Sequence, residues 1–157
     1  MTKHNPKTIL VICTGNMCRS PMAEAFLKTA VTPKNGFTTR SAGTSAVNGA
    51  TATPEAVQVM EERGIDISKH ASTRVSKTII ENADVILVMS LTHKNILSKK
   101  FPGHENKIFI YKEYAGTVNE SRDVPDPIGQ PMSVYRRVCH EIECASEKII
   151  EKLRTMV

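Results

Sequence analysis

Residues 11–24 read VICTGNMCRSPMAE, and this stretch decides the fold. An apolar run ends at Cys13, and Gly15 follows it in a short polar segment. Ser20 can cap a helix, and Pro21 suits the first turn of that helix. The stretch therefore predicts a β-strand, a tight loop and an α-helix in direct succession.

Strand-like and helix-like segments alternate along the remainder of the chain. The predicted strands are residues 8–13, 37–41, 85–89 and 107–111. The first predicted helix begins at residue 20, and the others cover residues 53–63, 92–99 and 133–153. This order predicts a three-layer α/β sandwich, in which helices cover both faces of a central four-stranded parallel sheet.

A sheet of this kind binds its ligands at the carboxyl ends of its strands. Cys13 is the last residue of the first predicted strand, and a loop rich in turn residues, RDVPDPIGQP at 122–131, follows the fourth. We therefore expect both segments at the same edge of the sheet, where a site would form.

Length and composition predict a single domain that comprises residues 1–157. A chain of 157 residues buries about 70% of its unfolded surface, which is enough for an ordinary core. Hydrophobic residues make up 40% and charged residues 24%, as in soluble globular proteins. No apolar run approaches the roughly 20 residues that cross a bilayer, so no membrane association is expected. The N-terminus lacks the h-region of a signal peptide, which predicts a cytoplasmic location with reduced cysteines.

The charge balance favours an anionic partner. The formal net charge is +5, and the sequence pI is about 9.1. The basic residues are scattered along the chain, and three tyrosines and four phenylalanines are too few for a base-stacking platform. We therefore expect no nucleic-acid partner.

Cys13 and Arg19 frame a C-x5-R loop whose features converge on a tetrahedral oxyanion. Gly15 and Asn16 can adopt backbone angles that turn successive N–H groups inward. The helix that follows directs the positive end of its dipole at the same place. Arg19 adds a planar guanidinium that can bind two phosphoryl oxygens at once. The phosphate-binding residues expected from this loop are Thr14, Gly15, Asn16, Met17, Cys18, Arg19 and Ser20.

The same loop supplies a nucleophile at Cys13, because positive potential stabilises a thiolate over a thiol. In-line attack of the sulfur on phosphorus gives a phosphocysteine, a reaction that needs no metal and no other cofactor. The leaving atom needs a proton from a carboxylic acid, which later acts as the base for water. Asp126 is the predicted acid because Pro125 and Pro127 stiffen its backbone, and Asp123 is its rival.

The segment CTGNMCRSP at 13–21, together with Asp126-Pro127, resembles the low-molecular-weight protein tyrosine phosphatases. The resemblance covers the whole length and the strand–helix order of the chain. It implies that Cys13 is the nucleophile, that Arg19 binds phosphate and that Asp126 is the general acid. The implied partners are a phosphorylated protein as the substrate and inorganic phosphate as the product.

That family also supports its phosphate loop with an asparagine, two serines and a histidine. The matching residues in this chain are Asn16, Ser20, Ser41 in RSAGT and His70 in SKHAS. In the family, the serine that matches Ser20 also hydrogen-bonds the nucleophilic sulfur. The resemblance implies the same supporting roles here.

Two features of the chain bear on the substrate, and they favour different branches of the family. Tyrosine-specific members usually carry aromatic residues directly after Asp-Pro, whereas this chain has Ile128-Gly129. The resulting Asp-Pro-x-Gly pattern looks similar to that of bacterial relatives that hydrolyse phosphoarginine. Those relatives usually have threonine where this chain has Met17, which is closer to the isoleucine or leucine of the tyrosine-specific branch. Phosphotyrosine is the first expectation, and phosphoarginine is the alternative.

Two further hypotheses rank lower. A branch of the same fold reduces arsenate with additional cysteines near the third strand, but the corresponding segment, SLTHKNILSKK at 90–100, contains no cysteine. A phosphate-binding module without turnover would need the cradle, but it would need neither the thiolate of Cys13 nor the acid of Asp126.

The remaining cysteines and histidines have weaker patterns. Cys18 either packs in the core or forms a disulfide with Cys13 that protects the nucleophile from further oxidation. Cys139 and Cys144 point about 140° apart around a helix, which does not suit a zinc site, and both are predicted to be buried. Four histidines show no partner pattern and are predicted to be surface or packing residues: His4, His93, His104 and His140.

Overall fold

The computed structural model describes residues 5–156, so His4 lies outside the described residues. Four parallel strands form one sheet with the order β2-β1-β3-β4. The strands are β1 (Lys7–Cys13), β2 (Phe37–Gly43), β3 (Val85–Val88) and β4 (Ile108–Ile110). The predicted four-stranded parallel sheet is confirmed, and β1 lies in its middle, as its uninterrupted apolar sequence requires.

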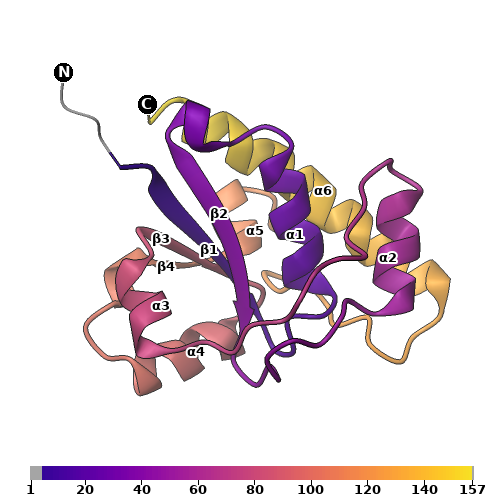
Figure 1. The fold of residues 1–157 in the computed structure, drawn as a ribbon, viewed down its shortest axis with the longest axis horizontal. Coiled ribbons are helices and arrows are strands. Elements are labelled where there is room, and N and C mark those ends of the chain that lie inside the picture. Colours follow the sequence, from indigo (N-terminus) through magenta and orange to yellow (C-terminus); the bar gives the residue numbers. More distant parts are fainter. Residues whose placement is uncertain (1–4, 157) are drawn as a thin grey trace.

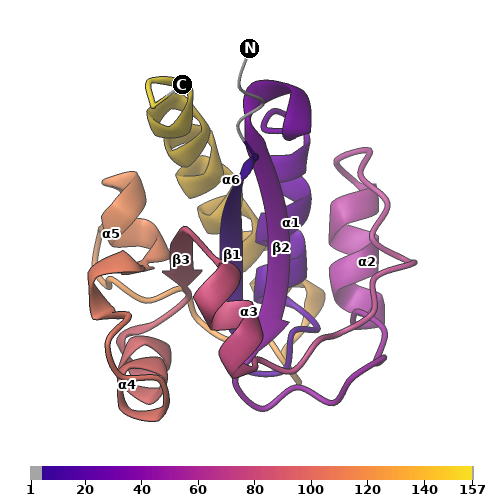
Figure 2. The same cartoon turned by 60° about the vertical axis from the view of Figure 1, so that its left-hand side comes forward.

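Helices cover both faces of this sheet (Figures 1 and 2). On one face, α6 (Met132–Arg154) packs against α1 (Arg19–Lys28), α2 (Pro54–Glu61) and α5 (Tyr111–Ala115). On the other face lie α3 (Lys77–Asn82) and α4 (Leu91–Lys100). The prediction of a three-layer α/β sandwich is confirmed.

Alternate residues of β1 pack into two separate hydrophobic clusters. Ile9 and Val11 belong to the cluster under α1 and α6. Leu10 and Ile12 belong to the cluster under α3 and α4. This alternation follows from the pleat of the strand, which directs neighbouring side chains to opposite faces.

Helix α2 begins as the sequence predicts. Its N-cap is Thr53, whose hydroxyl accepts a hydrogen bond from the backbone N–H of Ala56, and Pro54 is its first residue. Gly64, with φ +75°, lies just beyond its end. These signals act within one turn of the chain, so they can be read directly from the sequence.

The predicted cap of α1 is wrong. The helix begins at Arg19, and Cys18 occupies the N-cap position without a side-chain hydrogen bond to the helix. Ser20 lies inside the first turn, and its hydroxyl contacts Cys13 and Asn16 in the preceding loop. Its hydroxyl therefore serves the loop and leaves the helix N-terminus uncapped by a side chain.

The fourth strand ends earlier than predicted, and four short elements were not predicted from the sequence. The fourth strand ends at Ile110, and Tyr111 begins α5, which is closed by Gly116 at φ +74°. The helix α3 was not predicted, although Ser76 caps it by accepting from the N–H of Ile79. The short 3-10 helices are η1 (Pro33–Asn35) and η2 (Glu105–Lys107).

The end of β2 lies directly against the loop that follows β1. The backbone N–H of Thr44 donates to the carbonyl of Cys13 at 3.0 Å, and the N–H of Ser45 donates to the carbonyl of Thr14 at 2.9 Å. A Cβ at Gly43 would collide with the carbonyl oxygen of Thr14 and lie 2.9 Å from the amide nitrogen of Asn16. This close approach is possible because residue 43 has no side chain.

None of the helices in residues 5–156 has the length and apolar character that a membrane span requires.

Candidate active site

A pocket of about 200 Å³ opens at the carboxyl end of β1. It is formed by the loop between β1 and α1 and by the segment before α6. Its lining residues are Cys13, Thr14, Gly15, Met17, Cys18, Arg19, Asp126 and Ile128. A larger hollow of about 590 Å³ lies along β2 and does not include Cys13, so it is not the site of the nucleophile.

The sulfur of Cys13 lies 2.9 Å from the hydroxyl oxygen of Ser20. That hydroxyl also accepts a hydrogen bond of 2.8 Å from the side-chain amide of Asn16, so its own hydrogen can be donated to the sulfur. Cys13 is 3% exposed and stands before the N-terminus of α1. The sulfur therefore faces both a hydroxyl donor and the N-terminus of a helix.

Asn16 holds the shape of the loop. Its φ is +55°, and among residues 5–156 it is the non-glycine residue with a positive φ. Its amide also donates to the hydroxyl of Ser41 at 2.9 Å, and its side-chain oxygen accepts from the N–H of Thr73 at 2.9 Å. Gly15, which the sequence suggests can also adopt unusual angles, does not have a positive φ.

A second layer of side chains supports Asn16 from behind. The ring nitrogen Nε2 of His70 lies 2.8 Å from the carbonyl oxygen of Asn16. The hydroxyl of Ser41 donates to Glu24 Oε1 at 2.6 Å, and His70 Nδ1 lies 4.0 Å from the same oxygen. Glu24 was not among the predicted residues, although it lies one turn after Ser20 on the same face of α1.

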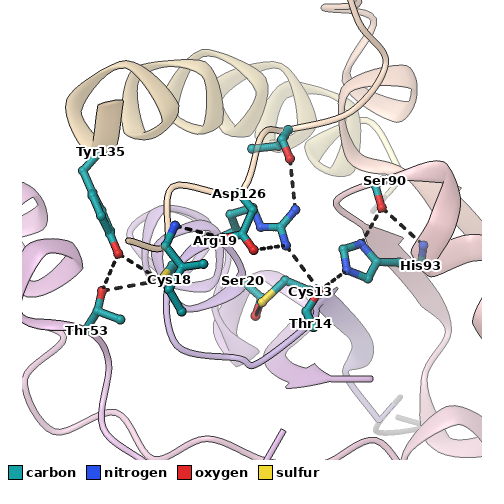
Figure 3. A network of polar contacts seen from close by, with 12 residues as sticks. Cys13, Thr14, Cys18, Arg19, Ser20, Thr53, Ser90, His93, Asp126 and Tyr135 are labelled. Atoms are coloured by element: carbon teal, nitrogen blue, oxygen red, sulfur yellow. Dashed lines mark hydrogen bonds and ion pairs between the residues drawn. The ribbon is translucent and has the colours of Figure 1, made fainter. Parts of the chain in front are cut away.

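The guanidinium of Arg19 is buried and held at three points around the pocket (Figure 3). Its Nη1 donates to the carbonyl oxygen of Val124 at 3.0 Å. Its Nη2 donates to the hydroxyl of Thr14 at 3.4 Å and lies 3.5 Å from Asp126 Oδ2. The cation is therefore fixed beside Cys13 before any ligand arrives.

The structure separates the two candidate acids. The carboxylate of Asp126 lines the pocket, and its side chain is 44% exposed, so it can reach both solvent and a ligand. Its Oδ1 accepts a hydrogen bond of 3.1 Å from the N–H of Ile128, which orients it. Asp123 instead accepts from the N–H of Leu91 at 2.9 Å, at the start of α4, and does not line the pocket.

His93 is buried beside the loop, which fits the packing option of the prediction, and it has two hydrogen-bond partners that the sequence pattern did not indicate. Its Nε2 lies 2.8 Å from the Thr14 hydroxyl, and its Nδ1 lies 2.8 Å from the hydroxyl of Ser90 (Figure 3). Burial, together with the charge of Arg19, lowers the pKa of His93 to about 4. The sequence signal for this contact was Ser90, a capping residue just after β3 that stands three residues before His93.

Cys18 lies on the side of Arg19 away from Thr14 and His93, in a polar cluster with Thr53 and Tyr135 (Figure 3). Its sulfur lies 3.4 Å from the hydroxyl of Thr53 and 3.5 Å from that of Tyr135. Burial raises the pKa of the Cys18 thiol and that of the Tyr135 phenol. Cys18 therefore remains a thiol, and its disulfide with Cys13 stays a prediction.

The two cysteines of α6 differ in exposure. Cys139 is buried, and burial raises its pKa to about 11. Cys144 is exposed, so the prediction that both are buried is wrong for this residue, because the two lie on different sides of the helix. In the part of the chain that the structure describes, no three His, Cys, Asp or Glu side chains gather as metal ligands.

Known proteins resemble the chain over nearly its whole length. Residues 8–157 match the family described as low molecular weight phosphotyrosine protein phosphatase. A protein-arginine-phosphatase of Geobacillus stearothermophilus is 37% identical over 150 residues, which are 96% of this chain and 98% of the relative. A probable low molecular weight protein-tyrosine-phosphatase, EpsP, of Ralstonia solanacearum is 35% identical over the same shares. The solved YwlE arginine phosphatase from G. stearothermophilus superposes with a TM-score of 0.88 at 37% identity, over 96% of this chain and 95% of that chain.

Proposed function

Because the chain belongs to the low molecular weight phosphotyrosine protein phosphatase family, we propose that it hydrolyses phosphorylated protein side chains through a phosphocysteine on Cys13. One observation carries this proposal. The Cys13 sulfur, which contacts the Ser20 hydroxyl, and the fixed Arg19 cation line one pocket. A binding module would need no nucleophile and no acid at these positions.

In the first step the Cys13 thiolate attacks phosphorus in line with the bond that breaks. The sulfur–phosphorus bond forms while the bond to the substrate oxygen or nitrogen breaks with its electron pair. Asp126 donates its proton to that leaving atom, since its carboxyl lines the same pocket as Cys13. Arg19 and the loop amides stabilise the charge on the three phosphoryl oxygens.

In the second step water attacks the phosphocysteine. Asp126, now a carboxylate, accepts a proton from that water, so it returns to the protonated form. The phosphorus–sulfur bond breaks, inorganic phosphate leaves, and Cys13 is again a thiolate stabilised by the Ser20 hydroxyl. No metal and no other cofactor takes part in either step.

The supporting residues keep the loop ready for both steps. Asn16 connects Ser20 to Ser41 through its amide, while His70 contacts its carbonyl. These bonds hold the loop in one conformation before substrate binds. Such preorganisation lowers the cost of stabilising charge in the transition state.

Phosphotyrosine is the substrate class that we propose first, because the thioether of Met17 gives the pocket an apolar wall suited to a phenol ring. Phosphoarginine is the second candidate. It is favoured by the exposed Ile128, which stands where an aromatic side chain would be expected beside a phenol, and by the similarity to protein-arginine-phosphatases. Arsenate reduction ranks lower because residues 90–100 contain no cysteine.

The test of this proposal compares initial hydrolysis rates on matched phosphotyrosine and phosphoarginine peptides, with Cys13→Ser as the blank. Wild type should release phosphate from one of them, and the variant should release none while still binding phosphate. A preference for phosphotyrosine would mean that Met17 determines the substrate preference of the pocket. A preference for phosphoarginine would mean that Ile128 and its neighbours determine it. Turnover by Cys13→Ser would overturn the nucleophile assignment.

We further propose that residues 1–157 act as one phosphatase domain in the cytoplasm. Two observations support this proposal. The sheet and both hydrophobic clusters extend across the described chain, and the mechanism needs Cys13 in the reduced form that this compartment maintains.

A further inference from the structure

The hydroxyl of Thr14 lies between the side chains of His93 and Arg19. On one side it is 2.8 Å from His93 Nε2, and on the other it is 3.4 Å from Arg19 Nη2. Thr14 also lines the pocket next to Cys13. This side chain therefore connects the buried histidine of α4 with the reacting centre (Figure 3).

The hydrogen bonds of Ser90 determine which nitrogen of His93 carries the hydrogen. The Ser90 oxygen already accepts from the backbone N–H of His93 as the cap of α4, at 3.3 Å. If its hydroxyl donates to Nδ1, every polar atom of this buried pair has a partner. The opposite tautomer would leave the hydroxyl hydrogen of Ser90 unpaired in a buried position, which is costly. We therefore assign the hydrogen to Nε2, which donates to Thr14.

The Thr14 oxygen then accepts two hydrogen bonds, one from His93 and one from Arg19. A hydroxyl has two acceptor positions and one donor, so its own hydrogen is left for a third partner. The pocket beside Cys13 is where that partner can lie, and a phosphoryl oxygen is the acceptor that the reaction brings there.

We propose that His93 is a positioning residue of this phosphatase site. It orients the Thr14 hydroxyl so that its hydrogen points at the phosphoryl group that is being transferred. The inference rests on the proposed phosphatase function. It adds to that function a side-chain donor that supplements the backbone amides of the loop. Because the bond to phosphoryl oxygen strengthens as charge develops, its loss should lower kcat more than it raises KM.

The test is a double-mutant cycle on hydrolysis of the better peptide substrate. Thr14→Val removes the hydroxyl at constant shape and should lower kcat on the order of 10- to 100-fold, the size of one hydrogen bond to a charged group. His93→Leu should cause a smaller loss of the same kind in wild type. In the Thr14→Val background it should cause almost none, because its effect passes through the missing hydroxyl.

Two variants separate positioning from a merely structural role. His93→Gln can place an amide donor near the position of Nε2, and it should restore most of kcat relative to His93→Leu. His140 is an exposed histidine of α6 away from the pocket, so His140→Leu and His140→Gln serve as matched controls and should leave kcat unchanged. Thermal unfolding of every variant identifies losses that come from misfolding.

The outcomes distinguish this inference from the proposed function. If wild type hydrolyses neither peptide, the proposed function fails, and this inference fails with it. If wild type is active but the losses of Thr14→Val and His93→Leu simply add, His93 does not act through Thr14. If wild type is active and Thr14→Val keeps full kcat, the hydroxyl is no donor to the phosphoryl group.

Discussion

At the scale of single residues, the hydrogen bonds of the two candidate acids decide which carboxyl group faces the pocket. Asp126 accepts a hydrogen bond from the N–H of Ile128 at Oδ1, and its Oδ2 lies 3.5 Å from Arg19 Nη2 beside the pocket. Asp123, three residues earlier, uses the same kind of bond to begin α4. On the proposed mechanism, Asp126 is therefore the carboxyl group positioned to transfer a proton.

The role of Asp126 predicts how the rate depends on the leaving group. In Asp126→Ala, hydrolysis of a substrate with a basic leaving group should slow on the order of 100-fold, because that group needs the proton. A substrate with an acidic phenol should slow far less, since its phenolate leaves unassisted. The measurement is kcat on a series of aryl phosphates of graded phenol acidity, with Asp123→Ala beside it. Equal losses across the series would exclude Asp126 as the acid.

The sequence predicts those functional residues that one local motif contains. Cys13, Arg19 and Ser20 lie within one turn of loop and helix, so their spacing is enough to place them together. His93 could not be placed in this way, because its contact with Thr14 exists only once β3 lies beside β1. Its role depends on strand order, which a single sequence does not state.

At the scale of elements, the approach of β2 to the phosphate loop is the contact that tolerates least change. Gly43 ends the strand, and both Thr14 and Asn16 come within contact of where its Cβ would be. The N–H of Gly43 also donates to the carbonyl of Thr73, which secures the segment that holds Asn16. A side chain at this position would therefore displace the loop itself.

Gly43→Ala should be harmful for both stability and activity. Overpacking of a fixed backbone costs about 1–3 kcal/mol of the free energy of unfolding, and the displaced loop should lose at least roughly tenfold in kcat/KM, as small misplacements at a reacting centre do. Urea unfolding and steady-state kinetics measure the two effects. Ser45→Ala, an exposed change two residues later, is the control. A stable and fully active Gly43→Ala would show that the loop can move aside.

Elements with a strong local signal could be predicted from the sequence, whereas two short helices could not. The cap at Thr53 is a strong signal because a capping residue stands directly before its helix. The run VILV of β3 is a strong signal because all its residues are apolar and β-strand formers are common in it. Helices α3 and α5 have six and five residues, too few to show a helical period. The switch from strand to helix at Tyr111 depends on packing, because its buried hydroxyl pairs with Ser146 of α6.

At the scale of the whole molecule, a buried neutral histidine between the sheet and the loop makes stability depend on pH. His93 has a pKa of about 4 in the folded state, against 6.5 ordinarily, and burial is the main cause. Arg19 lowers this pKa further, while Asp123 and Asp126 raise it. The unfolded chain binds the proton more tightly, so stability is lost as the pH falls from about 6.5 towards 4.

This linkage predicts a loss of about 2 kcal/mol from His93 between pH 7 and pH 5, on the scale of 1.4 kcal/mol for each unit of pKa difference. His93→Gln should lose less stability over the same interval, because glutamine does not titrate. Urea unfolding at the two pH values measures the difference. His140→Gln, on the exposed side of α6, should follow wild type. Parallel losses in wild type and His93→Gln would contradict the prediction.

The anchors of the loop at residues 13–20 are spread along the chain, and this spread has a consequence for protein synthesis. Arg19 is held by the carbonyl of Val124, and Cys18 lies in a cluster with Tyr135. A ribosome exposes the reactive cysteine long before it exposes these partners. On the proposed mechanism, the growing chain carries Cys13 before Arg19 can be held in place, and we expect dephosphorylation only after α6 has emerged from the ribosome and packed against α1.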